Sequence, residues 1–571
     1  MVRIPSPYKF EFASNTGKAT VNITGGHVGT RQQDGGDVFG ACRGEAGDRY
    51  VTAHLSYVKE TEVNISYPST ADMPDEATIQ NDASIPCITG SVHGSGEDGY
   101  VYGDAHVTLN NGLIGHSVYG AGKGKGTYPV TLAKMTGGGT FTANIYSLLA
   151  GRVMGNTYVT MNGGRVGRNI YGGGNMASVG KGNYAGSTQD DYSTDGYGER
   201  ITSKLWESGS ASDPAWEFLN SGKTDVKVFA GIVGYIDAAD PNKSIKNNMP
   251  YGNVFGGSAG EPAPNVPPTA IPRYLYSPAF FSGYVNATKV TIGGYRCKTP
   301  YSTYEEGATL TAAEYDVLAA GEKANWEKVG PKIYASIYGG GQDGHVRRDT
   351  WVVVDSCEVG LPYTAANRAL LKTSDVDNGQ WLHRGNVFGA GSGINMYSFD
   401  FNNDGEISGE VEIDGVKYPE HWYSTSAGSV TLSTRVDVKC GTIYRNVVGG
   451  GSFASVGPPK ITQPDYAARK TDIAADWGRQ SLNLVNIGGG KNADGSVATV
   501  TIGEANGIAA RYGGHVFGGS RGDSSVGKDF GISIWTQVNV RDGANILGDV
   551  FGGGNAGEVM KDTNVKIGTT E

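Results

Sequence analysis

One short motif recurs along the whole chain: a β-branched residue, then an aromatic residue, then a glycine. Further glycines usually follow it, as in the run Gly172-Gly-Gly that ends at Asn175. The aromatic residues of the clearest copies are Phe39, Tyr119, Tyr171, Phe255, Tyr338, Phe388, Phe517 and Phe551. A short unit that is repeated this often buries its apolar face by stacking on its own copies, so the motif indicates a repeat architecture.

A strand-like segment precedes the motif in several copies. Val159-Thr-Met-Asn-Gly-Gly164 and Val538-Asn-Val-Arg-Asp-Gly543 alternate apolar and polar residues before a glycine turn. A period of two places the apolar side chains on one face of a strand and the polar ones on the other. Each unit therefore predicts a short strand, a glycine turn, a second short strand and then the glycine run.

The spacing of the copies sets the size of the unit. With degenerate triplets counted, consecutive copies begin at Val118, Ile145 and Ile170, and again at Val228 and Val254. The longer gaps elsewhere are then one or two units with insertions. The resulting unit of roughly 25 residues suits one coil of a solenoid whose strands stack about 4.8 Å apart. We predict an all-β fold: a right-handed parallel β-helix (β-solenoid) with loop and short helical insertions.

In such a fold, equivalent side chains of successive coils lie above one another. We expect the Val/Ile column and the Phe/Tyr column to form internal ladders, the glycines to form corners, and Asn175 and Asn555 to form stacked amide ladders. A string of small β-sandwiches is the remaining alternative, but sandwiches would repeat about every 100 residues. Propeller blades of about 40–50 residues are longer than this unit.

The repeat content divides the chain into two parts. Residues 1–87 are less repetitive and predict an N-terminal β module or a solenoid cap, whereas residues 88–571 carry the glycine-rich solenoid. Non-repetitive stretches predict insertions near residues 181–224, 261–282, 299–330, 361–383, 396–426 and 458–482. In the third insertion, Thr311-Ala-Ala-Glu314 is a capping box that predicts a helix over 315–320, with a further helical turn or two over 322–328.

Composition and charge exclude several classes of protein. Glycine supplies 90 of the 571 residues but has no period of three, and proline supplies only 22, which excludes collagen. The net charge of −10 argues against a nucleic-acid partner. No stretch reaches the ~18 apolar residues that a membrane helix needs, so no membrane span is expected. The five cysteines are dispersed and show no metal or redox spacing.

One loop has the pattern of a calcium site. Asp400, Asn402 and Asp404 supply oxygens at positions 1, 3 and 5, a glycine follows at position 6, and Glu406 adds a carboxylate. The loop resembles EF-hand and dockerin-type sites over nine residues, and departs from them at position 12, where Val411 replaces the bidentate acid. Ca²⁺ is therefore the one expected cofactor. The alternative is a turn that leads into a hairpin over 410–418.

Catalytic patterns are weak. Asp190-Asp191 is a tight acidic pair, but it lies in an insertion rather than on a strand. The residues therefore indicate no catalytic site, and the sequence favours a protein that is not an enzyme. Arg521-Gly-Asp-Ser524 spells an integrin-recognition tripeptide, which arises easily by chance in a glycine-rich chain.

The Val-Phe/Tyr-Gly-Gly-Gly-Asn units, over about two-thirds of the chain, resemble the glycine-rich repeats of large surface-exposed proteins from anaerobic Gram-negative gut bacteria. The insert 310–318 is similar to inserts of such proteins. The resemblance implies export, attachment to the cell surface and an adhesive or structural role, and it implies no catalytic residues.

We therefore expect a secreted or cell-surface protein whose signal and anchor lie outside this fragment. Its insertions would present a face rich in Tyr and Trp to glycans or surface proteins. Two alternatives remain open: a polysaccharide-degrading enzyme (a lyase or glycoside hydrolase) on a β-helix scaffold, and a self-assembling surface fibre that associates end to end.

Overall fold

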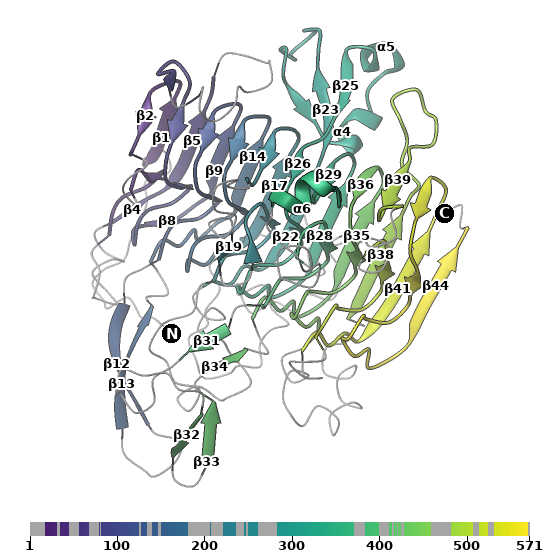
Figure 1. The fold of residues 1–571 in the computed structure, drawn as a ribbon. Coiled ribbons are helices and arrows are strands. Elements are labelled where there is room, and N and C mark those ends of the chain that lie inside the picture. The colour runs from purple at the N-terminus through teal and green to yellow at the C-terminus, as the bar shows by residue number, and fades with distance from the viewer. Residues whose placement is uncertain are drawn as a thin grey trace.

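The computed structural model shows a stack of short strands that runs from the N-terminal to the C-terminal part of the chain (Figure 1). It describes residues 17–30, 35–44, 56–67, 79, 81–124, 127–133, 140–146, 150–180, 206, 221–235, 245–246, 249–260, 283–370, 383–394, 396–398, 410–413, 416–419, 421–423, 427–457, 481–505, 513–523 and 530–568.

Within these residues, most strands belong to three long parallel sheets, named here sheets A, B and C. Sheet A comprises β1 (Lys18–Ile23), β5 (Glu60–Ile65), β9 (Ala105–Leu109), β14 (Thr157–Met161), β17 (Lys223–Val228), β22 (Ala287–Ile292), β28 (Thr350–Val354), β35 (Thr434–Val438), β38 (Leu482–Ile487), β41 (Trp535–Val540) and β44 (Thr563–Ile567). Sheet B comprises β2 (His27–Val28), β6 (Cys87–Ile88), β10 (Leu113–Ile114), β15 (Arg165–Val166), β18 (Ile232–Val233), β26 (Lys332–Ile333), β29 (Glu358–Val359), β36 (Gly441–Ile443), β39 (Val500–Ile502) and β42 (Ala544–Ile546). Sheet C comprises β3 (Val38–Phe39), β7 (Val92–His93), β11 (Val118–Tyr119), β16 (Ile170–Tyr171), β21 (Val254–Phe255), β27 (Ile337–Tyr338), β30 (Val387–Phe388), β37 (Val447–Val448), β40 (Val516–Phe517) and β43 (Val550–Phe551).

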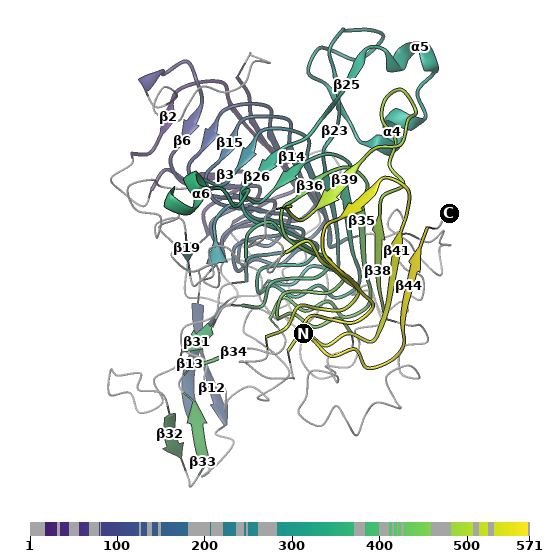
Figure 2. The ribbon, with the colours of Figure 1, turned by 45° about the vertical axis from the view of Figure 1, so that its right-hand side comes forward.

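The chain visits the sheets in the order A, B, C and then returns to A, and one such passage is called a coil below. The register is regular: Val63 of β5 pairs with Val107 of β9, which pairs with Val159 of β14. The result is a solenoid-like stack (Figures 1 and 2). The prediction of an all-β fold with stacked parallel strands is confirmed.

The interior of the stack is a single apolar cluster to which all three sheets contribute. In β5 the burial alternates residue by residue, so that Val63 and Ile65 are fully buried while Glu60, Glu62 and Asn64 keep some exposure. Sheet B adds residues such as Ile88, and sheet C adds the first residue of each strand, such as Val254. This is the period-two pattern that the sequence predicted for the strands.

The aromatic column lies elsewhere than expected. Val254 belongs to the interior cluster, but Phe255 beside it belongs to a separate buried cluster. The expectation of an aromatic ladder is confirmed, since consecutive rings such as Phe255 and Tyr338 stack with centres 4.7 Å apart, but the ladder lies outside the interior cluster rather than within it. The physical reason is that neighbouring residues of a strand point to opposite faces. Met249, Ala259, Ile394 and Phe453, from segments that connect the strands, pack onto the aromatic column.

The glycine of the motif is required by the close approach of the equivalent glycine in the next coil and, less tightly, of sheet A. A Cβ at Gly339 would lie 3.0 Å from Cγ2 of Val352 and even closer to the carbonyl oxygen of Gly389. Oγ1 of Thr288 donates a hydrogen bond of 2.5 Å to the carbonyl oxygen of Gly339. Across the described residues, the pairs joined in this way are Thr61–Gly94, Thr157–Gly172, Thr224–Gly256, Thr288–Gly339, Thr350–Gly389, Thr434–Gly449 and Thr536–Gly552.

A polar ladder runs along the residue that precedes each strand of sheet C. The side chain of each member accepts a hydrogen bond from the backbone N–H of the next member, as Asn253 Oδ1 does from Ser336 at 3.0 Å. The members are Asp37, Ser91, Ser117, Asn169, Asn253, Ser336, Asn386, Asn446, His515 and Asp549. The stacked polar side chains thus precede the motif, whereas the sequence placed them after it, at Asn175 and Asn555.

The predicted unit of roughly 25 residues matches the shortest coil, but two of the triplets used to derive it do not lie on sheet C. Ile145 lies in a hairpin and Val228 lies at the end of β17 in sheet A, so neither triplet is a copy on sheet C. The true partner of Val118 on sheet C is Val92, one short unit earlier in the chain. Ile170 pairs with Val254 across a long insertion. Each longer gap on sheet C is a single coil enlarged by an insertion.

Two further short strands pair in parallel within the stack, between sheets C and A: β4 (Tyr57–Val58) with β8 (Tyr100–Val101). The described part of the insertions forms small antiparallel sheets outside the stack: β12 (Thr127–Ala133) with β13 (Thr140–Tyr146), β19 (Ile245–Lys246) with β20 (Met249–Pro250), β23 (Gly294–Cys297) with β24 (Thr309–Leu310) and β25 (Trp326–Val329), β31 (Met396–Ser398) with β34 (His421–Tyr423), and β32 (Glu410–Ile413) with β33 (Val416–Pro419). The β12–β13 and β32–β33 hairpins project from one side of the stack, and β23, β25 and α5 (Ala320–Lys323) from the opposite side (Figures 1 and 2).

The helices of the described residues are short: α4 (Ala312–Asp316), α5 (Ala320–Lys323) and α6 (Ala365–Leu370). The capping box at Thr311 is present, since its hydroxyl accepts from the N–H of Glu314 and the Glu314 carboxylate accepts from the N–H of Thr311. The prediction of a helix over 322–328 is wrong beyond Lys323, because Trp326 is buried and opens β25, which pairs with β23.

The three sheets begin before residue 88, where the sequence placed the start of the solenoid. β1 and β5 are already paired in parallel in sheet A, and β2 and β6 are paired in sheet B. The described part of residues 1–87 therefore supplies the first coil and the beginning of the second, whose sheet C strand β7 follows at Val92.

Candidate functional site

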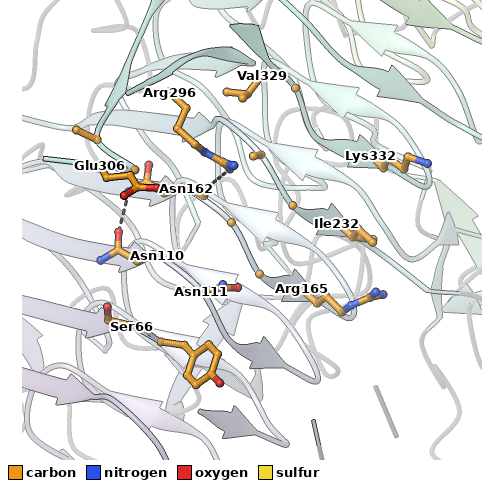
Figure 3. A pocket seen from close by; sticks show the side chains of 18 of the residues that line it. Ser66, Asn110, Asn111, Asn162, Arg165, Ile232, Arg296, Glu306, Val329 and Lys332 are labelled. Carbon is orange, nitrogen blue, oxygen red and sulfur yellow. Dashed lines mark hydrogen bonds between the residues drawn. The ribbon is translucent and has the colours of Figure 1, made fainter. Parts of the chain in front are cut away.

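An open groove lies where the chain turns from sheet A to sheet B. It has a volume of about 1280 Å³ and runs beneath the insertion that carries β23, β24 and β25 (Figure 3). The coils supply Ser66, Tyr67, Asn110, Asn111, Asn162, Gly163, Gly164, Arg165, Ala230, Gly231, Ile232, Gly330 and Lys332, and the insertion supplies Arg296, Glu305, Glu306, Gly307, Ala308 and Val329.

Asparagine side chains line the floor of the groove. Asn110 and Asn162 follow β9 and β14, so the stacking of the coils places one above the other. Asn162 Nδ2 donates to Asn110 Oδ1 at 2.8 Å, and Thr309 Oγ1 donates to Asn162 Oδ1 at 2.8 Å. Arg296 on β23 donates to the carbonyl oxygen of Asn162 at 3.1 Å (Figure 3). These bonds fix the insertion over the groove and hold the amide groups in place.

Charged side chains of both signs border the groove. Arg165 and Lys332 lie at equivalent positions of sheet B, two coils apart, and Glu305 and Glu306 come from the insertion. Nε of Arg165 is buried and has no hydrogen-bond partner among the described residues. Lys332 lies 3.6 Å from Glu358 and remains largely exposed. The groove thus offers amides, guanidinium and ammonium donors, and carboxylate acceptors.

The aromatic side chains of this insertion do not form the presented face that the sequence led us to expect. Tyr295, Tyr315 and Trp326 are each 2% exposed and form the insertion's own apolar core. Trp326 Nε1 donates to the hydroxyl of Tyr301 at 2.8 Å, so the polar group of the indole is also used internally. Tyr67 is the one aromatic residue that lines the groove in the part of the chain that is described.

A second charged cluster, on the outer face of sheet A, was missed by the sequence analysis. Asp437 accepts hydrogen bonds from Trp351 Nε1 at 2.9 Å, from Arg435 Nε at 2.7 Å and from Asn486 Nδ2 at 2.6 Å. The guanidinium of Arg435 lies 5.1 Å from the centre of the Trp351 ring. The carboxylate therefore serves to hold its neighbours in a stacked arrangement.

Asp355 lies next to this cluster. Its Oδ1 is 3.4 Å from Nζ of Lys439, and burial raises the pKa of its carboxyl group against the opposing effect of that ammonium. Asp355 and Asp437 are far apart in the sequence and meet only because β28 and β35 pair in register. An alignment of the repeats in their strand register could have revealed this cluster. In that register Val353 lies opposite Asp437, and Asp355 therefore falls opposite Lys439.

The residues singled out from the sequence fall in different places. The eight aromatic residues of the motif all lie on sheet C. The loop with Asp400, Asn402, Asp404 and Glu406 lies outside the described residues, as does the Asp190-Asp191 pair. Within the described part of the chain, no group of three or more His, Cys, Asp or Glu side chains is placed to hold a metal ion.

The integrin-type tripeptide is packed against the stack. Arg521 contacts Nδ1 of His383 at 3.0 Å, and it donates to Ser452 Oγ at 3.4 Å. A receptor that reads the tripeptide needs the guanidinium free, so this arrangement disfavours that role.

No protein-family model, curated protein or solved structure matches the chain. Among the described residues, no helix has the length and apolar character to cross a membrane.

Proposed function

We propose that this protein is an extracellular adhesive or structural rod, a right-handed parallel β-helix that binds glycan chains in the groove between sheets A and B. The observation that carries the proposal is the open groove of about 1280 Å³ with its column of amide groups. The repeated passage through sheets A, B and C supports the β-helix, and the general chirality of parallel crossovers supports the right hand.

The chemistry of the groove suits sugar hydroxyls. Each hydroxyl both donates and accepts, and Asn110 and Asn162 offer amide oxygens and N–H groups side by side. The groove is open along the stack, so an extended chain fits it better than a compact metabolite. Arg165 and Lys332 add cationic donors, and Glu305 and Glu306 add carboxylate acceptors, for sugar hydroxyls at the border of the groove.

A polysaccharide-degrading enzyme is less well supported. The carboxylates that the fold brings together, Asp355 and Asp437, lie on the face of sheet A rather than in the groove. Asp437 is held by three donors, which leaves it poorly placed to act as a base or nucleophile. Export and attachment to the cell surface rest on the resemblance of the repeats, and a loop that holds Ca²⁺ at Asp400 and Asp404 belongs to the same proposal.

The proposal is tested by binding of the intact chain to a glycan array, followed by titration of the best ligand. The double variant Arg165→Gln/Lys332→Gln removes both cations while leaving Arg296 and the asparagine column unchanged. We expect the affinity for the captured glycan to fall at least tenfold. The matched control is Lys561→Ala, which removes an exposed cation from the far end of the stack and should leave the affinity unchanged.

Failure to bind any glycan, or equal losses in the double variant and the control, would contradict the groove as the binding site. Cleavage of the bound glycan that disappears in Asp355→Asn would favour the enzyme instead.

A further inference from the structure

The aromatic column of sheet C is interrupted at its second position by a histidine. His93 stacks between Phe39 and Tyr119, with ring centres 4.7 Å apart on each side and nearly parallel planes. Farther along, the column continues through Tyr171 and Phe255 with similar spacing. A polar ring in an otherwise apolar stack is unfavourable, which calls for a physical reason.

His93 is 1% exposed, and its Nδ1 is buried without a hydrogen-bond partner among the described residues. Burial is the main cause that lowers the pKa of this imidazole to about 3, so the ring is neutral at pH 7. A neutral imidazole keeps one donor and one acceptor nitrogen. The imidazole therefore has hydrogen-bonding capacity that the described residues do not use.

The ring lines a pocket of about 300 Å³ on the outer face of sheet C. Asp37 and Lys123 form an ion pair of 3.3 Å at this pocket, and Asp37 also accepts from the backbone N–H of Ser91 at 2.8 Å. On another side, the guanidinium of Arg168 lies 4.9 Å from the centre of the Tyr251 ring.

The charges of the pocket do not balance. Lys123 is offset by Asp37, whereas Nε of Arg168 is buried and has no hydrogen-bond partner in the part of the chain that is described. A guanidinium with an unbonded N–H that lines the same pocket as a neutral imidazole favours a ligand with one carboxylate. A volume of about 300 Å³ limits that ligand to a small molecule.

We propose that this pocket binds a single acidic monosaccharide, of the uronic acid class, with its carboxylate on Arg168 and a ring hydroxyl on the imidazole of His93. The site is separate from the groove between sheets A and B, so the two proposals fail independently.

The experiment is a calorimetric titration of the intact protein with D-glucuronate, with D-glucose and acetate as matched probes. We expect D-glucuronate to bind, D-glucose to bind at least tenfold more weakly because it lacks the carboxylate, and acetate to bind at least tenfold more weakly because it lacks the ring. Arg168→Gln should weaken D-glucuronate at least tenfold and bring it close to D-glucose.

The decisive variant is His93→Phe, which restores the aromatic column. Because phenylalanine removes a buried unsatisfied nitrogen while keeping the stack, we expect the Tm to stay the same or to rise and D-glucuronate binding to be lost. No binding of D-glucuronate to the unchanged protein, equal binding of D-glucose, or unchanged binding to folded His93→Phe would each overturn the proposal.

Discussion

At the scale of the residue, each of the three positions of the recurring triplet has its own structural role. Its first residue fills the interior, its aromatic residue stacks on the outer face of sheet C, and its glycine admits the threonine of sheet A. The threonine recurs in most coils but is replaced by Ala105 on β9 and by Asn483 on β38, and a strand of sheet B separates it from its glycine in the sequence. Thr288 and Gly339, for example, are separated by a whole insertion. A hydroxyl in this position is tolerated only because the glycine carbonyl accepts its hydrogen.

Thr288→Val tests this pairing. The substitution keeps the shape of the side chain but leaves the Gly339 carbonyl without this donor in a fully buried site. We expect a loss of about 1–3 kcal/mol of stability, seen as a lower Tm by differential scanning calorimetry. The control is Thr563→Val, which occupies the same register on β44 but is exposed, and which should change the Tm little. Equal shifts in the two variants would show that the bond contributes nothing.

At the scale of the element, the sequence predicted the length and stacking of the strands more accurately than the face of the sheet on which the aromatic column lies. Alternation and spacing were sufficient to predict short stacked strands, because period two and a short repeating unit are local properties. The position of the aromatic column could not be read from composition, since a Val–Phe pair looks the same whichever residue faces inward. Only the neighbours decide, and they come from segments such as Met249 and Ile394 that the motif does not contain.

The candidate site was harder to predict than the fold. The groove combines the ends of β9 and β14 with an insertion that arrives much later in the chain, at Arg296. The Asn-Gly turns at its floor were visible as turn signals, but nothing local indicates that they lie in one column beneath charged side chains. His93 was hidden for a similar reason: Val92-His93-Gly94 is a copy of the triplet in which the aromatic residue is replaced.

The loop before the β32–β33 hairpin is the element for which metal removal is informative. The hairpin itself is present, with Ile413 paired to Val416. If the preceding loop binds Ca²⁺ through Asp400 and Asp404, EDTA should lower the Tm of the intact protein, since a ligand that binds only the folded state stabilises it. Asp400→Ala should abolish the difference between the metal-loaded and chelated samples. An unchanged Tm with EDTA would exclude the loop as a stabilising site.

At the scale of the whole molecule, the stack buries ionisable groups along much of its length. Three histidines, His93, His345 and His383, are at most 8% exposed, and burial is the main cause that lowers the pKa of each below the usual 6.5. His345 is held by Ser429 at 2.8 Å and Thr431 at 2.9 Å, and the charge of Arg347 further disfavours its protonation. Such groups link the stability of the entire stack to pH.

The direction in which stability changes with pH depends on whether the folded or the unfolded chain binds protons more tightly. Because the folded pKa of each buried histidine is lower than its unfolded pKa, acidification is expected to protonate the unfolded chain first and so to favour unfolding. The stability is complete above about pH 6.5 and is lost as pH falls from there toward the folded pKa, by up to about 1.4 kcal/mol per pH unit for each histidine. Asp355 has the opposite effect on stability at low pH, because its pKa is raised by burial and its protonation in the folded state removes a buried charge. The three buried histidines outnumber it, so we expect their effect to dominate.

We therefore expect the Tm, measured by calorimetry at constant ionic strength, to fall steadily from pH 7 to pH 4.5. His345→Gln replaces the ring by an amide that can still bond Ser429 and Thr431 but cannot be protonated in this range, so it should make the slope shallower. His106→Gln is the matched control, because His106 is exposed on β9. A Tm that is flat over this range, or slopes that are equal in the two variants, would mean that the buried histidines do not govern the acid stability of the stack.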